Sequence, residues 1–312
     1  MRAIGVTEYG GPEALHEVEV EREPLGPGEV RVQVLAAAVN PTDTYVRNGG
    51  RDDAPRAKTV AVPGMDVCGS VLELGDGVDD RLAVGQLVMA VVVPSGEHGA
   101  YREEIVLPSG SVVSAPSGFT DAEIASVPMN TLTACLAFQL LDLPTGATIA
   151  VTGAAGAFGG AAVQLAKEAG LTVIADASDA DRDLVAGFGA DTVLPRGAGF
   201  ADAVRELHPD GVDALLDGSV QGPEVTGAVR DGGGFATVRG WDGDGDTRLS
   251  YHPTWVRNVA ERHDLLDRIT ALVERGVITP RVADVLPAAD AAEAHRRLEA
   301  GGVRGRLVLD FT

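Results

Sequence analysis

Residues Thr148–Lys167, with the sequence TIAVTGAAGAFGGAAVQLAK, combine an apolar segment, a turn with evenly spaced glycines and a run of small residues. The apolar residues around Ile149 and Val151 predict a short buried strand, and Val163 to Ala166 continue the stretch as a helix. A strand, a glycine turn and a helix in this order bring backbone N–H groups and a helix N-terminus toward a negatively charged ligand. The stretch therefore predicts a binding site for the diphosphate of a dinucleotide.

Each of the three glycines in this turn is expected to have a different structural role. Gly153 allows a tight turn, Gly156 lets backbone amides approach the phosphates, and Gly159 lets the helix lie close to the strand. The spacing is G-x-x-G-x-x-G rather than the common G-x-G-x-x-G, so the prediction depends on the neighbouring elements. A second apolar strand at Thr172–Ala175 supplies that context.

A membrane span is the alternative interpretation of this region, because residues 143–166 carry no charge and Gly156 and Gly160 have the spacing of a helix dimer in a bilayer. Pro144 and Gly146 interrupt the first part of the stretch, and no second span or basic flank is visible. We therefore expect no membrane partner.

Length, charge and cysteine content limit the class of protein. The chain has 312 residues, of which 45% are hydrophobic, so two domains with ordinary cores are expected. Two cysteines, Cys68 and Cys135, cannot build a disulfide framework, and the first residues lack the apolar core of a secretion signal, so a cytoplasmic location is expected. A net charge of −21 disfavours nucleic acid as a partner.

The pattern along the chain changes near residue 121. Before it, short β segments alternate with Gly and Pro; they are Arg2–Val6, Glu29–Val39, Gly69–Leu74, Gln86–Val93 and Tyr101–Val106. After it, strands and helices alternate, with helices expected at Asp179–Phe188 and Pro223–Val229 and strands at Val212–Leu216 and Phe235–Val238. This alternation predicts an α/β fold with a parallel, doubly wound sheet beside a β-rich lobe.

Two polar segments carry candidate chemistry. Asn40 to Tyr45 directly follow an apolar strand, and Pro63 to Gly69 read PGMDVCG. Within the first segment, Asp43 is interpreted as a turn or helix cap rather than an acid catalyst. No His-x-x-x-His pair, paired carboxylates or nucleophile elbow appear, so neither a hydrolytic site nor a metal site is expected.

Taken together, the motifs resemble the medium-chain dehydrogenase/reductase superfamily and, within it, the zinc-free quinone oxidoreductases related to zeta-crystallin. The resemblance extends over essentially the full chain; its motifs are GVTEYGGPEAL, VNPTDTYVRNG, PGMDVCG, LTA at Leu132–Ala134, the glycine stretch, FGAD at Phe188–Asp191 and AHRRLEAGGVRGRLVL. It implies a GroES-like catalytic domain over residues 1–122, completed by about 255–312, and a Rossmann domain over 123–254.

The resemblance also implies the absence of zinc. The zinc-dependent relatives have a cysteine at the position of Asn40 and a histidine at that of Met65, and neither Asn nor Met binds Zn²⁺ well. Asp66 stands where those relatives carry a glutamate, and we interpret it as structural. By the same resemblance, Asn40 and Tyr45 are the expected catalytic residues near a nicotinamide.

The coenzyme is expected to be NADPH, although one observation favours NADH. Asp176 lies 20 residues beyond Gly156, the spacing of a carboxylate on the ribose 2′-hydroxyl. Matching the chain to the family instead puts Ala177 at the acidic position, with Ser178, Arg182 and Arg196 suited to a 2′-phosphate. The alternative for both arginines is a solvated surface role. The full set of expected coenzyme residues is Thr133, Gly153, Ala155, Gly156, Ala157, Phe158, Gly159, Ser178, Arg182, Arg196, Gln221, Val238, Arg239 and Gly240.

The resulting prediction is an NADPH-dependent quinone oxidoreductase that transfers hydride to a quinone or an α,β-unsaturated carbonyl without zinc. The alternatives are an enoyl or tailoring reductase of a polyketide-like pathway and a non-catalytic NADPH-binding protein. A small-molecule acceptor and a second copy of the chain, in a homodimer, are the expected partners.

Overall fold

The computed structural model describes residues 1–50 and 60–312, which form two compact units. The first unit contains Met1–Met129, Ala260–Arg275 and Pro280–Thr312, and the second contains Asn130–Val259 and Gly276–Thr279. The chain thus leaves the first unit at Met129, builds nearly all of the second, and returns at Ala260, apart from the short excursion at Gly276–Thr279. The fold class is the predicted one, with a β-rich GroES-like unit and a Rossmann-type parallel sheet.

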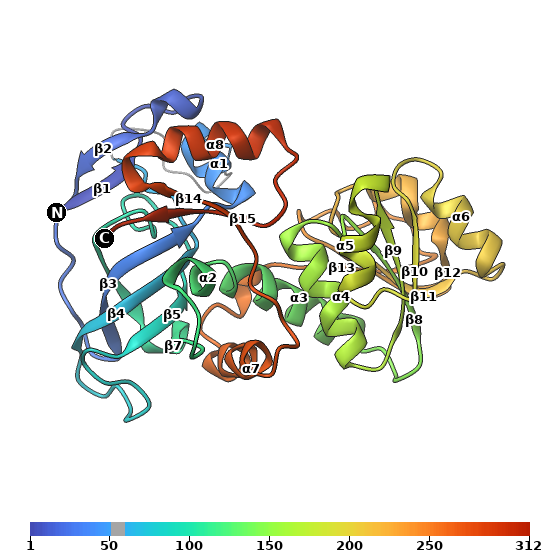
Figure 1. Ribbon diagram of the computed structural model, residues 1–312, viewed down its shortest axis with the longest axis horizontal. Coiled ribbons are helices and arrows are strands. Elements are labelled where there is room, and N and C mark those ends of the chain that lie inside the picture. Colours follow the sequence, from blue (N-terminus) through green and yellow to red (C-terminus); the bar gives the residue numbers. More distant parts are fainter. Residues whose placement is uncertain (51–59) are drawn as a thin grey trace. The chain divides into compact units, whose positions relative to one another are not determined.

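A seven-stranded sheet organises the first unit, in the order β14-β15-β3-β4-β5-β7 with β6 also paired to β3. Figure 1 shows the red C-terminal strands β14 and β15 beside the blue strand β3. β3 pairs with β15, β4 and β6, and its alternating residues Val30 and Val32 are fully inaccessible within the hydrophobic core of the unit. The elements of this unit are β1 (Arg2–Gly5), β2 (His16–Glu19), β3 (Glu29–Ala38), α1 (Pro41–Asn48), β4 (Asp66–Leu74), β5 (Leu87–Val91), β6 (Glu104–Pro108), β7 (Val112–Ser114), α2 (Asp121–Ala125), α7 (His263–Glu274), β14 (Val282–Pro287), α8 (Ala291–Ala300) and β15 (Arg306–Asp310).

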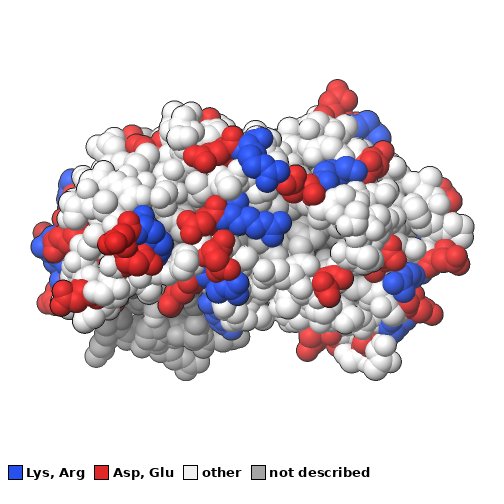
Figure 2. All heavy atoms as spheres, turned by 90° about the horizontal axis from the view of Figure 1, so that it is seen from below, with Lys and Arg blue, Asp and Glu red and all other residues white. Residues whose placement is uncertain are grey.

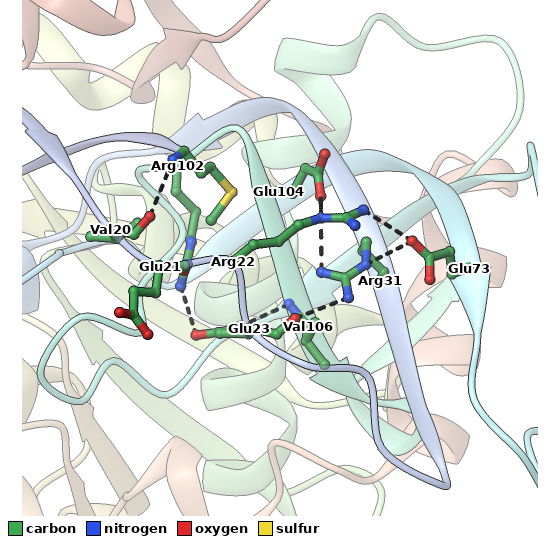
Figure 3. Close-up of polar contacts among 10 residues, drawn as sticks. Val20, Glu21, Arg22, Glu23, Arg31, Glu73, Arg102, Glu104 and Val106 are labelled. Carbon is green, nitrogen blue, oxygen red and sulfur yellow. Dashed lines mark hydrogen bonds and ion pairs between the residues drawn. The ribbon is translucent and has the colours of Figure 1, made fainter.

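A network of arginines and glutamates fastens the segment Val20–Glu23 to this sheet (Figure 3). Arg102, which is 1% exposed, donates to the Glu23 carboxylate over 2.7 Å. Arg22 and Arg31 share the carboxylates of Glu73 and Glu104. Buried guanidinium groups are costly unless paired, so these contacts fix the path of the segment.

The second unit is built on a six-stranded sheet in the order β10-β9-β8-β11-β12-β13, in which every pair is parallel. Right-handed crossovers place α4 and α5 on one face and α6 on the other, as Figure 1 shows. The strand order reverses between β8 and β11, where such sheets bind ligands beyond their carboxyl ends. The elements are α3 (Pro128–Leu141), β8 (Thr148–Thr152), α4 (Ala157–Glu168), β9 (Thr172–Ala177), α5 (Arg182–Gly187), β10 (Thr192–Pro195), α6 (Phe200–Leu207), β11 (Val212–Asp217), β12 (Val229–Thr237) and β13 (Ser250–Pro253).

Three local expectations differ from the structure. The helix expected at Pro223–Val229 is a short 3-10 helix over Gly222–Ala228, and β12 already begins at Val229. The three glycines 232–234 hide this strand because they carry no side chains to show its pattern. The polar segment after β3 is a helix, α1, with Pro41 in its first turn.

The helical stretch Asp121–Leu141 is long and apolar enough to cross a membrane, judged by length and composition. Its most apolar window is 78% buried within the structure, and a core helix of a soluble protein passes the same test. Residues 143–166, which raised the question in the sequence, form β8 and most of α4. On the face of the described chain that Figure 2 shows, acidic and basic side chains are interspersed; the absence of membrane and nucleic-acid partners stays a prediction.

Candidate functional site

The glycine turn lies at the carboxyl end of β8, at the point where the strand order reverses. Gly153 has a φ of +68°, and a Cβ atom there would lie 2.9 Å from the backbone of Gly218, in the loop after β11. A Cβ atom on Gly159 would lie 2.2 Å from the carbonyl oxygen of Gly153. The first and third glycines are therefore required by the close approach of the turn to its neighbours.

The amino end of α4 supplies the donors that an anion needs. The first intrahelical hydrogen bond runs from the Gly160 N–H to the Gly156 carbonyl over 2.9 Å, so the amides of residues 157–159 have no acceptor within the helix. These amides and the positive end of the helix dipole favour a phosphate. The structure brings the predicted residues Gly153, Ala155, Gly156, Ala157, Phe158 and Gly159 together in this one turn.

Asp217, a buried carboxylate at the end of β11, was not predicted from the sequence as part of the site. It makes hydrogen bonds close to the glycine turn. Asp217, which is 2% exposed, accepts hydrogen bonds from the Thr152 hydroxyl over 2.7 Å and from the Gly222 N–H over 2.8 Å. Its position directly after the apolar residues 212–216 was the available signal. Asp217 thus connects the ends of β8 and β11. It orders the loops that follow these two strands, at the place where the strand order reverses.

Asp176 lies at the end of β9 and does not face outward as a ribose-binding carboxylate would. Its Oδ1 accepts a hydrogen bond from the Ala154 N–H over 3.1 Å, and the side chain is buried. Burial raises the pKa of Asp176, while the amides of Ala154 and Gly153 and the charge of Arg196 lower it. One oxygen of the carboxylate is therefore engaged by the glycine turn.

The three residues assigned to a 2′-phosphate lie around the carboxyl ends of β9 and β10. The Ser178 hydroxyl donates to Asp181 over 2.5 Å, and Arg182 donates to the Val193 carbonyl over 2.8 Å. Arg196 has an exposed side chain, and its N–H donates to the Ala177 carbonyl over 3.0 Å. All three residues thus lie in the segments that follow β9 and β10, and the Ser178 and Arg182 side chains are held by contacts within the chain.

The remaining coenzyme candidates are spread over three elements. Gln221 follows β11 and donates to the Ser219 hydroxyl over 2.7 Å, while Thr133 is buried in α3. Val238, Arg239 and Gly240 follow β12, and Arg239 is exposed. Gly240 has a φ of +80° and packs against the indole of Trp255, a residue missed in the sequence.

In the first unit, Asn40 caps α1 and is fully buried. Its Nδ2 group donates to Asp66 over 2.9 Å and to the Ala38 carbonyl over 3.2 Å, so both amide hydrogens are used. Its Oδ1 atom has no hydrogen-bond partner among the described residues. A buried acceptor without a donor is rare, and the full burial of Asn40 separates this atom from solvent and from ligands alike.

A buried polar chain connects α1 to α8. The Tyr101 hydroxyl donates to Asp43 over 3.0 Å and lies 3.3 Å from His295 Nε2, and Arg47 lies 3.2 Å from His295 Nδ1 and 2.6 Å from Glu299. Arginine only donates, so His295 Nδ1 accepts and Nε2 carries the proton. Burial and the Arg47 charge lower the pKa of His295 to about 3, in keeping with a neutral ring.

Asp43 is the acceptor end of that chain. It also accepts hydrogen bonds from the N–H groups of Asn40 and Gly64 over 2.8 and 3.0 Å. Burial nevertheless raises the pKa of Asp43 to about 7. These contacts match the interpretation of Asp43 as a cap, and they hold α1, which carries Asn40 and the half-buried Tyr45, in place.

The residues at the position of a catalytic zinc in related enzymes do not fit the metal. Asn40 turns its N–H groups toward Asp66, and Asp66 forms a buried ion pair with Arg306 over 3.0 Å. Met65 offers only a buried thioether. Among the described residues, no group of three or more His, Cys, Asp or Glu side chains is arranged to hold a metal ion.

Two family models match the chain over long ranges. Residues 26–117 match the alcohol dehydrogenase GroES-like domain, and residues 188–309 match the zinc-binding dehydrogenase family. The chain belongs to the medium-chain dehydrogenase/reductase superfamily of oxidoreductases, which confirms the resemblance seen in the motifs.

Individual relatives agree with this assignment. The mouse synaptic vesicle membrane protein VAT-1 homolog-like is 31% identical over 225 residues, covering 70% of this chain and 51% of the relative, so the chain spans about half the length of such relatives. The tomato 2-methylene-furan-3-one reductase is 26% identical over 99% of this chain and 79% of its own. A mycobacterial protein solved in complex with NADPH is 28% identical, with a TM-score of 0.86 over 99% of this chain and 100% of its own.

Proposed function

We propose that the chain is an NADPH-dependent reductase that transfers hydride to a quinone or an α,β-unsaturated carbonyl without zinc. The observation that carries the proposal is the glycine turn at the amino end of α4, where Gly159 leaves no space for a side chain beside Gly153. Such a turn suits a diphosphate, and family membership suits a nicotinamide coenzyme. When bound, the coenzyme supplies the hydride.

The preference for NADPH is supported by two features of the second unit. Asp176 is directed into the glycine turn, so its carboxylate neither binds a ribose 2′-hydroxyl nor repels a 2′-phosphate at close range. Arg182, Arg196 and Ser178 gather at the ends of the neighbouring strands and suit a phosphate dianion. The NADPH complex of the mycobacterial relative agrees with this choice.

The residues of the first unit suit an acceptor that is already electron-poor. Asn40, Met65 and Asp66 provide no Lewis acid, so the acceptor must take the hydride with hydrogen bonds alone. We propose that the half-buried Tyr45 orients the acceptor or the coenzyme and that the buried Asn40, as the cap of α1, holds the helix that carries Tyr45. Reduction adds one hydride and one proton, and the proton comes from water or a local donor.

Steady-state kinetics with a panel of acceptors tests the proposal. Purified protein is mixed with NADPH and with quinones, small enones or enoyl thioesters, and coenzyme oxidation is followed at the absorbance of the reduced nicotinamide. Fast turnover with quinones or enones supports the proposal, and turnover restricted to enoyl thioesters identifies the alternative reductase instead. Tight NADPH binding without turnover of any acceptor identifies a non-catalytic binding protein.

The tomato relative favours the enone part of this panel, because its name describes an unsaturated ketone as the substrate. A homodimer and a cytoplasmic location stay predictions. Size-exclusion chromatography with light scattering tests the first of them.

A further inference from the structure

The carboxylate of Asp176 contacts the backbone of the glycine turn. Its Oδ1 atom accepts a hydrogen bond from the Ala154 N–H of the glycine turn over 3.1 Å, and the neighbouring Gly153 N–H also lowers the pKa of the carboxyl group. The side chain is 4% exposed. It therefore binds the chain itself at the point where β8 passes into the diphosphate-binding turn.

We propose that Asp176 is a positioning residue that holds the glycine turn in its diphosphate-binding shape, so that it sets the affinity for NADPH and NADH alike and not the choice between them. This inference rests on the proposed function. It assigns to the carboxylate a role opposite to that indicated by its spacing from Gly156, since a ribose-binding residue discriminates between the two coenzymes.

The geometry explains why the turn needs a carboxylate here. β8 ends at Thr152 and Gly153 has a φ of +68°, so the chain leaves the strand directly before Ala154. A buried N–H group without an acceptor is destabilising. Hydrogen bonds to a charged acceptor are stronger than neutral ones, so Asp176 fixes the turn at Ala154.

The neighbouring charges keep the carboxylate compatible with an anionic ligand. Asp217, on β11, raises the pKa of Asp176, and Arg196, after β10, lowers it. Arg196 thereby offsets part of the negative charge that Asp176 and Asp217 place below the turn. An asparagine at position 176 can still accept the Ala154 N–H through its amide oxygen, so it keeps the hydrogen bond and removes the charge.

The test compares two substitutions with a matched control. Asp176→Ala removes the hydrogen bond to Ala154, Asp176→Asn retains a neutral acceptor, and Asp213→Ala removes the carboxylate that accepts the Thr148 N–H at the opposite end of β8. Dissociation constants for NADPH and NADH are measured by nicotinamide fluorescence or calorimetry. Hydrogen exchange of residues 151–158 is measured without coenzyme, and circular dichroism reports folding.

We expect Asp176→Ala to weaken NADPH and NADH by the same factor, about tenfold or more, and to speed exchange in the turn. Asp176→Asn should recover most of the affinity, and Asp213→Ala should change neither affinity. Selective loss of NADH with stronger NADPH binding would overturn the inference, as would unchanged affinities and exchange. If the wild type binds neither coenzyme, the proposed function fails, and the exchange rates still decide whether Asp176 holds the turn.

Discussion

The hydroxyl of Tyr101 donates a hydrogen bond to the buried carboxylate of Asp43 over 3.0 Å. Both side chains are fully inaccessible to solvent, so water cannot replace either partner. The contact joins the segment before β6 to the helix that begins beside Asn40. Loss of this hydrogen bond should therefore lower the free energy of unfolding and shift the position of α1.

Tyr101→Phe is expected to lower the free energy of unfolding by about 1–3 kcal/mol, because a buried carboxylate loses a donor. Urea denaturation at pH 8 measures the loss. Tyr251→Phe is the control, since that hydroxyl also donates to an aspartate, Asp246, but at the surface. Equal effects of the two substitutions would contradict the buried role of Tyr101.

Glu23 should make the first unit sensitive to acid. Burial opposes ionisation, but His98 and Arg102 together lower the pKa of Glu23 from 4.5 to about 2. A carboxylate with a lowered pKa stabilises the fold above pH about 4.5, and this contribution disappears as the pH falls toward about 2. A shift of about 2.5 pKa units corresponds to roughly 3 kcal/mol.

Glu23→Gln should therefore be less stable than the wild type at pH 7 and similar to it near pH 2. Thermal unfolding followed across this pH range measures the difference. Glu103→Gln, which breaks a surface pair with Arg2, is the control and should cost less than about 1 kcal/mol. A constant difference at all pH values would show that the Glu23 charge does not stabilise the fold.

Gly159→Ala should abolish tight coenzyme binding, because the new methyl group would lie 2.2 Å from the Gly153 oxygen and force the turn open. We expect a loss of affinity of at least about tenfold. Gly187→Ala in α5 is the matched control, since a methyl group there meets no atom within 4 Å. It should leave binding intact and stabilise the helix by up to about 1 kcal/mol.

Arg182→Ala and Arg196→Ala should each weaken NADPH about tenfold while leaving NADH nearly unchanged, because only NADPH carries the 2′-phosphate. Dissociation constants for both coenzymes give the ratio directly. Arg230→Ala, which removes a guanidinium from the surface of the same unit, serves as the control. Equal losses for NADPH and NADH would mean that the two arginines act through structure or general charge.

Removal of metal ions should not change the rate of NADPH oxidation by the acceptor. The Asn40 amide and the Asp66–Arg306 pair leave no zinc ligands at the position used by related enzymes, so a strong chelator is expected to be without effect. Mass spectrometry of the purified protein should find zinc far below one equivalent. Activity that disappears with the chelator and returns with added zinc would refute this prediction.

The sequence predicts the second unit well where apolar runs are continuous. β8, α4 and β9 follow from such runs, because interior strands of a parallel sheet are buried on both faces and show no alternation. β12 is obscured by its glycines, and α6 was not expected at all. Local pattern is therefore sufficient for the central strands and insufficient toward the edges.

The candidate site could likewise be predicted only where its residues are close together in the sequence. The glycine turn is a local motif, so its six residues could be named from the sequence. Tyr101, Asp43 and His295 are brought together only by tertiary folding, over separations of 58 and 194 residues, and no spacing rule connects them. Asp176 lies at the spacing expected of a ribose-binding carboxylate, and its Oδ1 atom accepts a backbone N–H of the glycine turn instead, a contact that no spacing rule shows.

The pairing of β15 with β3 has a consequence for synthesis of the chain. Val308 lies opposite Ala38, so the carboxyl end of β3 pairs with a strand that follows the whole parallel sheet in the chain. All six strands of the parallel sheet have emerged by Pro253, well before that partner exists. Until β15 has been synthesised, Ala36–Ala38 of β3 lack this partner, and such an open strand edge is prone to pair with other chains.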